Sequence, residues 1–136
     1  MIPYLFSTVV DAHLRGGSLI KNASYEEESH QVGDYLFTKA ITSTDNRVSF
    51  HLPSEGEWMD FYNGKKYAPG SLIEEAYALE HFPLFVKEGA ILPLNVASEI
   101  TGLGDASMAG RRTIMIYPNG NTTRLLHLPC GDGIEY

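Results

Sequence analysis

The apolar residues near the N-terminus repeat with the period of an α-helix. The repeating positions are Ile2, Leu5, Phe6, Val9 and Val10. Pro3 suits a first helical turn and Gly16-Gly17 suits a helix end. The pattern therefore predicts one amphipathic helix. Because three or four turns cannot bury such a face alone, we expect this helix to pack on a partner surface.

From Ser18 onward the pattern changes to short runs of β-branched and aromatic residues, separated by turn signals such as Asn63-Gly64. In one run Val48, Phe50 and Leu52 alternate with polar residues, as half-buried strands do. The predicted strands are residues 19–20, 35–37, 48–52, 58–62, 71–77, 84–86, 91–92, 113–117 and 124–128. The sequence thus predicts a mainly β fold, an antiparallel β-sandwich preceded by one amphipathic α-helix.

The composition and the net charge of the chain limit the classes of partner that it is expected to bind. A chain of 136 residues with 43% hydrophobic and 20% charged residues is typical of a globular domain. A net charge of -7 opposes binding to nucleic acid, whose phosphates require clustered cations. No apolar run approaches the roughly 20 residues that span a bilayer, so no membrane partner is expected. Residues 1–20 lack a signal-type pattern, and the compartment stays undetermined.

The sequence contains no recognisable motif for a metal site, a cofactor site or a catalytic nucleophile. The five histidines, residues 13, 30, 51, 81 and 127, form no i, i+4 pair, and Cys130 is the single cysteine. A transition-metal site needs such ligand spacings, so no metal and no cofactor are predicted. The serines have no Gly-x-Ser-x-Gly context, and no phosphate-binding glycine loop is present.

An aromatic group around residue 60 admits two interpretations. Trp58, Tyr62 and Tyr67 are candidates for a sugar-stacking platform, because flat rings suit the apolar faces of pyranoses. Strand alternation instead places Trp58 and Tyr62 on one face and Phe61 on the other, which favours packing. Asp60 is expected to accept hydrogen bonds from amides of the following turn.

Several segments resemble the C-terminal part of glycoside hydrolase family 31, the α-glucosidases and α-xylosidases. Two of them carry most of the resemblance, GEWMDFYNG at residues 56–64 and HFPLFVKEGAILP at residues 81–93. Near the start, IPYLF at residues 2–6 and Ala12-His13 are similar to a late helix of the catalytic barrel. The resemblance covers residues 2 to about 95.

The family resemblance implies a domain organisation. Residues 1–32 would be the last helix and strand of a (β/α)8 catalytic barrel, and residues 33–130 the proximal C-terminal β-sandwich. Residues 131–136 would be the truncated start of a following segment. The family's catalytic aspartates lie on earlier barrel strands, and no position here matches their motifs. The resemblance therefore implies no catalytic residue in this chain.

Two features bear on a glycosidase site directly. Where the family's last barrel strand usually carries an Arg-Pro pair, residues 19–25 read LIKNASY, so Lys21, Asn22 and Tyr25 are the substrate-proximal candidates. A general acid and a nucleophile would need two carboxyl groups about 5–5.5 Å apart, or farther apart for inversion. The carboxylates nearest in sequence are Glu26 to Glu28, Glu74-Glu75, and Asp132 with Glu135, and none forms a convincing pair.

Three hypotheses follow. The first is a non-catalytic β-sandwich that braces the catalytic barrel of the same parent chain, with carbohydrate bound and hydrolysed by the parent. The second is an independent carbohydrate-binding β-sandwich module built on Trp58, Tyr62 and Tyr67. The third concerns association: an exposed stripe of Leu5, Phe6, Val9 and Val10 would let the chain self-associate through its helix face. The sequence leaves open whether the chain is itself an enzyme.

Overall fold

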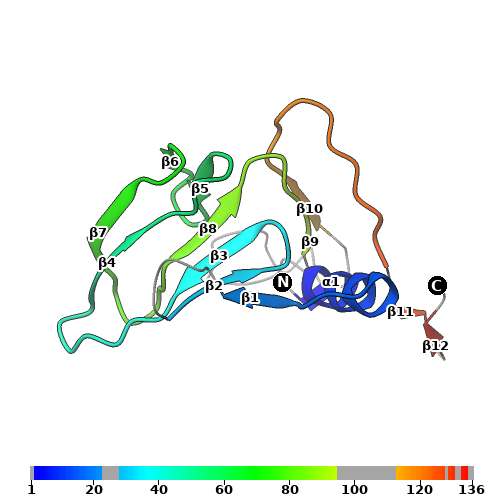
Figure 1. The fold of residues 1–136 in the computed structure, drawn as a ribbon, viewed down its shortest axis with the longest axis horizontal. Coiled ribbons are helices and arrows are strands. Elements are labelled where there is room, and N and C mark those ends of the chain that lie inside the picture. The colour runs from blue at the N-terminus through cyan, green and yellow to red at the C-terminus, as the bar shows by residue number, and fades with distance from the viewer. Residues whose placement is uncertain (1, 23–27, 95–112, 128, 131–132, 135–136) are drawn as a thin grey trace. The chain divides into compact units, whose positions relative to one another are not determined.

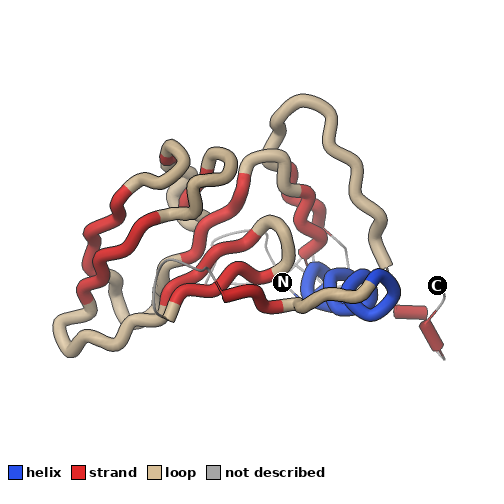
Figure 2. The backbone as a smooth tube through the Cα atoms, in the orientation of Figure 1, coloured by secondary structure: helices blue, strands red, loops and turns tan. Residues whose placement is uncertain are grey.

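The computed structural model describes residues 2–22, 28–94, 113–127, 129–130 and 133–134. Figure 1 traces one helix followed by short strands, and Figure 2 shows how much of the chain is strand. The chain divides into two compact units. Unit 1 comprises Met1–Leu19 and Gly89–Tyr136, and unit 2 comprises Ile20–Glu88. The predicted domain boundaries at residues 32 and 130 refer to a parent enzyme and stay a prediction.

Unit 2 contains a six-stranded sheet and a two-stranded sheet, with every pair of neighbouring strands antiparallel. The large sheet has, in spatial order, β1 Ile20–Asn22, β2 Ser29–Val32, β3 Leu36–Lys39, β8 Leu84–Lys87, β5 Trp58–Asp60 and β6 Lys66–Tyr67. The small sheet pairs β4 Arg47–His51 with β7 Leu72–Ala76.

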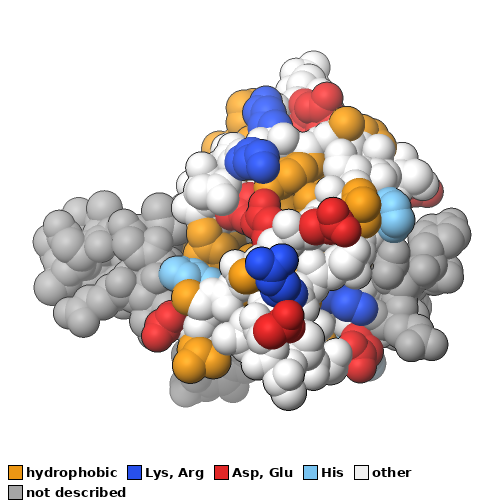
Figure 3. Space-filling model, turned by 90° about the vertical axis from the view of Figure 1, so that its left-hand side faces the viewer, with side chains coloured by type: hydrophobic (Ala, Val, Ile, Leu, Met, Phe, Trp, Pro, Cys, Tyr) orange, Lys and Arg blue, Asp and Glu red, His pale blue; other side chains and the backbone are white. Residues whose placement is uncertain are grey.

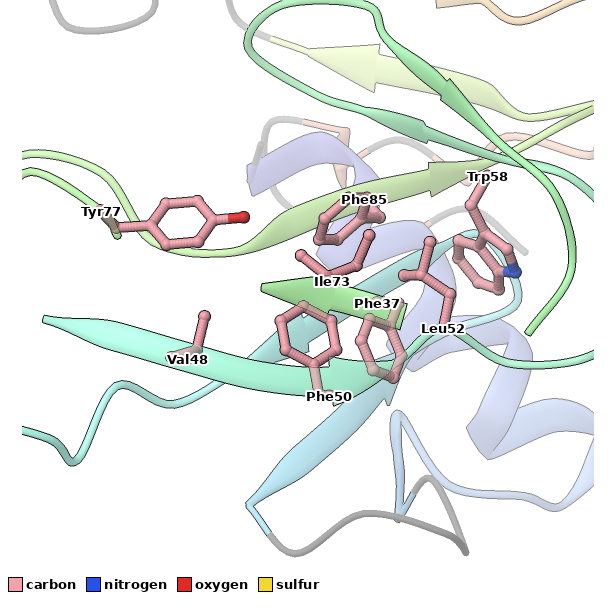
Figure 4. Close-up of a cluster of buried hydrophobic side chains, with 8 residues drawn as sticks. All are labelled: Phe37, Val48, Phe50, Leu52, Trp58, Ile73, Tyr77 and Phe85. Carbon is pink, nitrogen blue, oxygen red and sulfur yellow. The ribbon is translucent and has the colours of Figure 1, made fainter. Parts of the chain in front are cut away.

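The hydrophobic core of unit 2 lies between these two sheets. Along β4 the buried residues Val48 and Phe50 alternate with exposed neighbours, and Phe50 stands opposite buried Ile73 of β7. From the large sheet, Phe37 and Phe85 are fully buried and pack with Phe50 at ring-centroid distances of 5.8 Å and 5.9 Å (Figure 4). This arrangement confirms the antiparallel β-sandwich with one preceding helix.

Unit 1 is built from a helix and short hairpins. Helix α1 spans Ile2–Arg15. The first hairpin pairs β9 Ile91–Leu94 with β10 Thr113–Ile116, and the second pairs β11 Pro129–Cys130 with β12 Gly133–Ile134. Helix α1 contacts β9, whose Leu92 and Leu94 are buried. The predicted segment 131–136 falls mostly outside the described residues.

The apolar face predicted for α1 is only partly buried within this chain. The helix buries Tyr4, Ser7, Thr8 and Val10, whereas Ile2 is 75% exposed and Val9 is 46% exposed. The physical reason is that the polar side chains of the helix have hydrogen-bond partners in residues 124–127 of the same unit. Of the apolar residues that set the helical period, Val10 is therefore buried, whereas Ile2 and Val9 lie on the exposed side.

Three strand predictions also need correction. Residues 124–127 form no strand although residues 124–128 were predicted to, because this segment bonds to side chains of α1 rather than to another strand. The strand beginning at Trp58 ends at Asp60 instead of Tyr62, where a turn begins. Strands β2 and β6 were not predicted, since neither has a clear apolar alternation.

Candidate functional site

Asp60 organises the turn that follows β5. Its side chain is 3% exposed. Its Oδ1 accepts hydrogen bonds from the backbone N–H of Tyr62 at 2.8 Å and of Asn63 at 2.9 Å. The backbone oxygen of Asp60 accepts from the N–H of Gly64 at 3.0 Å, and Gly64 has a left-handed φ of 72°. The prediction that Asp60 accepts from turn amides is confirmed, and its carboxylate is committed to the turn.

Trp58 is part of the core of unit 2. Its side chain is 1% exposed, and its ring lies edge-on to Phe37 at 5.9 Å between centroids (Figure 4). The indole N–H donates to the backbone oxygen of Pro53 at 3.2 Å, so the polar end of the ring is satisfied inside the protein. A ring in this position has no face open to a sugar in this structure.

Tyr62 and Tyr67 are half-buried and contact different neighbours. The Tyr67 hydroxyl donates to Glu75 Oε1 at 3.2 Å, and the ring lies edge-on to Phe85 at 5.6 Å. The Tyr62 ring lies edge-on to His81 at 4.6 Å. Burial raises the pKa of both phenols, so both stay protonated at neutral pH. With Trp58 buried, the three predicted stacking residues do not form one exposed platform.

Two of the predicted substrate-proximal residues, Lys21 and Asn22, belong to β1. Lys21 Nζ forms an ion pair with Asp34 Oδ1 at 2.9 Å, and the two side chains are 49% and 76% exposed. The backbone of Asn22 pairs with His30 of β2. The side chain of Asn22 and all of Tyr25 lie outside the described residues. A role of these residues at a substrate pocket stays a prediction.

The described carboxylates among the candidates are not arranged as a catalytic pair. Glu74 and Glu75 are neighbours on β7 and so point to opposite faces of the strand. Glu28 accepts a hydrogen bond from the Thr42 hydroxyl at 3.1 Å, while the other candidates lie outside the described residues. In the part of the chain that the structure describes, no three His, Cys, Asp or Glu side chains gather as metal ligands. No helix in this part is long and apolar enough to cross a membrane.

A polar cluster in unit 1 joins α1 to residues 124–127 and was missed at the level of sequence. The Ser7 hydroxyl accepts from the backbone N–H of His127 at 3.0 Å. His127 Nε2 lies 3.1 Å from Asp11 Oδ1, and the His127 side chain is 8% exposed. Arg124 donates to Thr8 Oγ1 at 3.0 Å and lies over the Tyr4 ring, 4.6 Å from its centroid.

This cluster contains serine, histidine and aspartate but lacks the geometry of a catalytic triad. In a triad the serine hydroxyl bonds to the imidazole, whereas here the Ser7 hydroxyl bonds to backbone groups. The cluster therefore fastens the helix rather than activating a nucleophile. The spacing of Ser7, Thr8 and Asp11 on one helical side is the only sequence signal for it.

Comparison with known proteins places this architecture in a family. The model of the "Glycosyl hydrolase family 31 C-terminal domain" matches residues 17–92, more than half of the chain. The chain belongs to glycosyl hydrolase family 31. The resemblance found in the sequence is thereby confirmed, and the matched part is the C-terminal domain of that family.

Relatives in family 31 are several times longer than this chain. An alpha-glucosidase of Saccharolobus solfataricus is 28% identical over 78% of this chain and 16% of the relative. An alpha-xylosidase of the same organism is 26% identical over 100% of this chain and 19% of the relative. The chain thus spans less than a fifth of the length of each of these two curated relatives.

A solved structure in the family has the same fold. The cycloalternan-forming enzyme from Listeria monocytogenes, in complex with a pentasaccharide substrate, is 26% identical to this chain, with a TM-score of 0.78. The similarity covers 92% of this chain and 13% of that enzyme.

Proposed function

We propose that this chain is the non-catalytic C-terminal β-sandwich part of a family 31 α-glycosidase and that it braces the catalytic barrel. In this proposal residues 1–32 complete the barrel, residues 33–130 form the bracing sandwich, and residues 131–136 begin a following segment. The parent enzyme hydrolyses terminal α-linked sugars on aspartates that lie outside these residues. Lys21, Asn22 and Tyr25 are proposed to border its substrate pocket.

The observation that carries the bracing proposal is the orientation of α1. The polar side of the helix is bonded within unit 1 through Ser7, Thr8 and Asp11. On another side of the helix the apolar residues Ile2, 75% exposed, and Val9, 46% exposed, remain accessible in this chain. Exposed apolar area of this kind gains free energy when a partner covers it. The catalytic barrel of the parent is the proposed partner.

The proposal predicts that the chain alone is inactive. Incubation with aryl α-glycosides should give no turnover above background, because no described carboxylate pair is available for acid and nucleophile. Turnover that survives replacement of a barrel aspartate in the parent, but is lost on a substitution within this chain, would contradict the non-catalytic role.

The bracing contact itself can be tested by comparing two charge substitutions on α1. Val9→Asp places a charge on the open apolar side, and Leu14→Asp places it on another side of the helix at a similar exposure of 51%. In the chain alone, both should change stability little. In the parent enzyme, Val9→Asp should lower Tm clearly more than Leu14→Asp, because it buries a charge at the contact. Equal effects in the parent would refute bracing through this face.

Two other hypotheses can be compared with bracing, one by the Val9→Asp variant and one by the exposure of Trp58. Self-association through the helix face predicts dimers of the chain in sedimentation that Val9→Asp abolishes; Val10 is not part of that face, being 6% exposed. An independent carbohydrate-binding module built on Trp58 would need that ring to be accessible, and it is 1% exposed. We therefore favour bracing over a binding module with Trp58 at its centre.

A further inference from the structure

Unit 2 has a pocket of about 440 Å³ at one end of its large sheet. Its walls come from β2, the end of β3 with the residues that follow, the turn before β4, and the loop between β7 and β8. The volume lies within the range of roughly 300–1,000 Å³ that small-molecule sites occupy in proteins. All of its described walls belong to one compact unit, so the pocket does not depend on how the two units are placed.

The charge of the pocket does not select an ion. None of its described lining residues is an aspartate or a glutamate, and its one full cation is Lys39. Lys39 takes part in another interaction within the protein. The side of unit 2 that carries β4 and β7 likewise shows acidic and basic side chains interspersed rather than one charged field (Figure 3). The binding capacity of the pocket therefore rests on neutral polar groups.

Asn46 presents one of these neutral groups. Its backbone has a left-handed φ of 57° and is held on both sides, since its N–H donates to Ser43 at 3.3 Å and its oxygen accepts from Tyr77 at 3.0 Å. Among the contacts of the described residues, none engages its side-chain amide. A side-chain amide with free donors and acceptors suits a ligand that can both donate and accept hydrogen bonds.

Histidine and threonine side chains extend this polar lining. His30 Nδ1 is buried without a hydrogen-bond partner among the described residues. Such an orphaned atom indicates a missing partner, because unpaired buried polar groups are costly. His30 also lines the pocket, and a water or a ligand hydroxyl could supply this partner. The Thr38 hydroxyl donates to the Pro83 oxygen at 2.8 Å and can still accept a hydrogen bond.

An aromatic wall stands beside these polar groups. Phe82 is 47% exposed and lines the pocket together with His81. Tyr62 packs edge-on against both rings, at 4.6 Å from His81 and 6.3 Å from Phe82 between centroids. A ring supported in this way offers an apolar face to the C–H face of a ligand.

We propose that this pocket binds a small neutral polyhydroxylated ring, such as a single sugar unit, with its C–H face on Phe82 and its hydroxyls on Asn46 and His30. Hydroxyl groups match neutral lining groups that each donate or accept. The site is separate from the bracing role and does not rest on it. A ligand of this size in a half-open pocket is expected to bind with a Kd of about millimolar.

The test is a titration of the full chain with D-glucose, followed by nuclear magnetic resonance of backbone amides. Saturable shifts should concentrate at His30, Asn46 and Phe82. Phe82→Ala and Asn46→Gly should each weaken binding about tenfold, the effect of losing one good contact. Glycine tolerates the left-handed φ at position 46, so this variant removes the amide without straining the turn. Glucose 6-phosphate should bind no more tightly than glucose.

The matched control is Leu72→Ala, since Leu72 is 50% exposed on β7 and does not line the pocket. It should leave the glucose Kd unchanged. The proposal is overturned if glucose gives no saturable shifts at the three residues, or if neither pocket variant weakens binding. Much tighter binding of the phosphate would instead mean an anion site. Val9→Asp should not alter the titration, which keeps this test independent of the bracing contact.

Discussion

The two units of the chain are stabilised by different kinds of contact. In unit 2 the buried residues between the sheets are almost all apolar, and Phe37, Phe50 and Phe85 form its centre. In unit 1 the helix is fastened by polar contacts of Ser7 and Asp11 beside buried Tyr4 and Val10, while Ile2 and Val9 stay exposed. Unit 2 therefore holds its own hydrophobic core, whereas α1 keeps apolar surface available for a partner.

The largest expected effect comes from the core of unit 2. Trp58→Ala should lower the free energy of unfolding by about 3–5 kcal/mol, because it removes a fully buried ring and leaves a cavity. Urea denaturation followed by circular dichroism measures this. Leu79→Ala, at a site 88% exposed, is the control. Its free energy of unfolding should stay within about 0.5 kcal/mol of that of the unsubstituted chain. A mild effect of Trp58→Ala would mean that the ring is not a core residue.

An intermediate effect is expected at the polar contact of unit 1. Ser7→Ala leaves the buried N–H of His127 without its acceptor, which costs about 1–3 kcal/mol. The loss should appear as faster hydrogen exchange of α1 amides, with β3 and β8 unchanged. Arg15→Ala breaks only an exposed ion pair with Asp11 on the same helix and should cost less than about 0.5 kcal/mol. If both variants behave alike, the Ser7 contact does not fasten the helix.

The smallest effect is expected at Tyr77, whose buried hydroxyl has no partner among the described residues and points toward the core cluster (Figure 4). Tyr77→Phe removes this group and should change the free energy of unfolding at pH 7 by less than about 1 kcal/mol, toward higher stability. A clear loss of stability at pH 7 would show that the hydroxyl has a partner.

The same variant should change the response to alkaline pH. Burial raises the pKa of Tyr77 far above its ordinary value, so the folded state keeps a proton that the unfolded state releases above pH of about 10. The contribution of this proton to the free energy of unfolding is therefore fully present below a pH of about 10, and it is lost as the pH rises further. Urea midpoints from pH 7 to 11 should therefore fall less steeply in Tyr77→Phe than in the unsubstituted chain. Identical slopes would contradict the burial of this phenol.

The same contrast explains what the sequence could predict. Strand β4 was predictable because one face is buried and its alternation is local. The existence of α1 was predictable from its period, but its buried face was not, because the partners of Ser7 and Asp11 lie 120 and 116 residues away. Local apolar spacing indicates which side prefers burial, and the distant polar partners decided which side was buried within this chain.

The candidate sites, too, were predictable from the sequence only where their contacts are local. The role of Asp60 was predictable because its partners are two and three residues away. The pocket beside Phe82 was not, because it joins β2, the end of β3, Asn46 and the loop before β8. Of the two interpretations of Trp58, packing agrees with its place in the core, because the ring lies in the cluster formed between the large sheet and strands β4 and β7.

Native-state hydrogen exchange of the isolated chain tests the difference between the two units most directly. Amides of β3 and β8 in unit 2 should exchange only through global unfolding, since these strands carry fully buried Phe37 and Phe85. Amides of α1 should exchange through a local opening of much lower free energy, because the helix lacks a cover on its apolar side. Equal protection of α1 and β3 would contradict the account, since the helix would then need no partner.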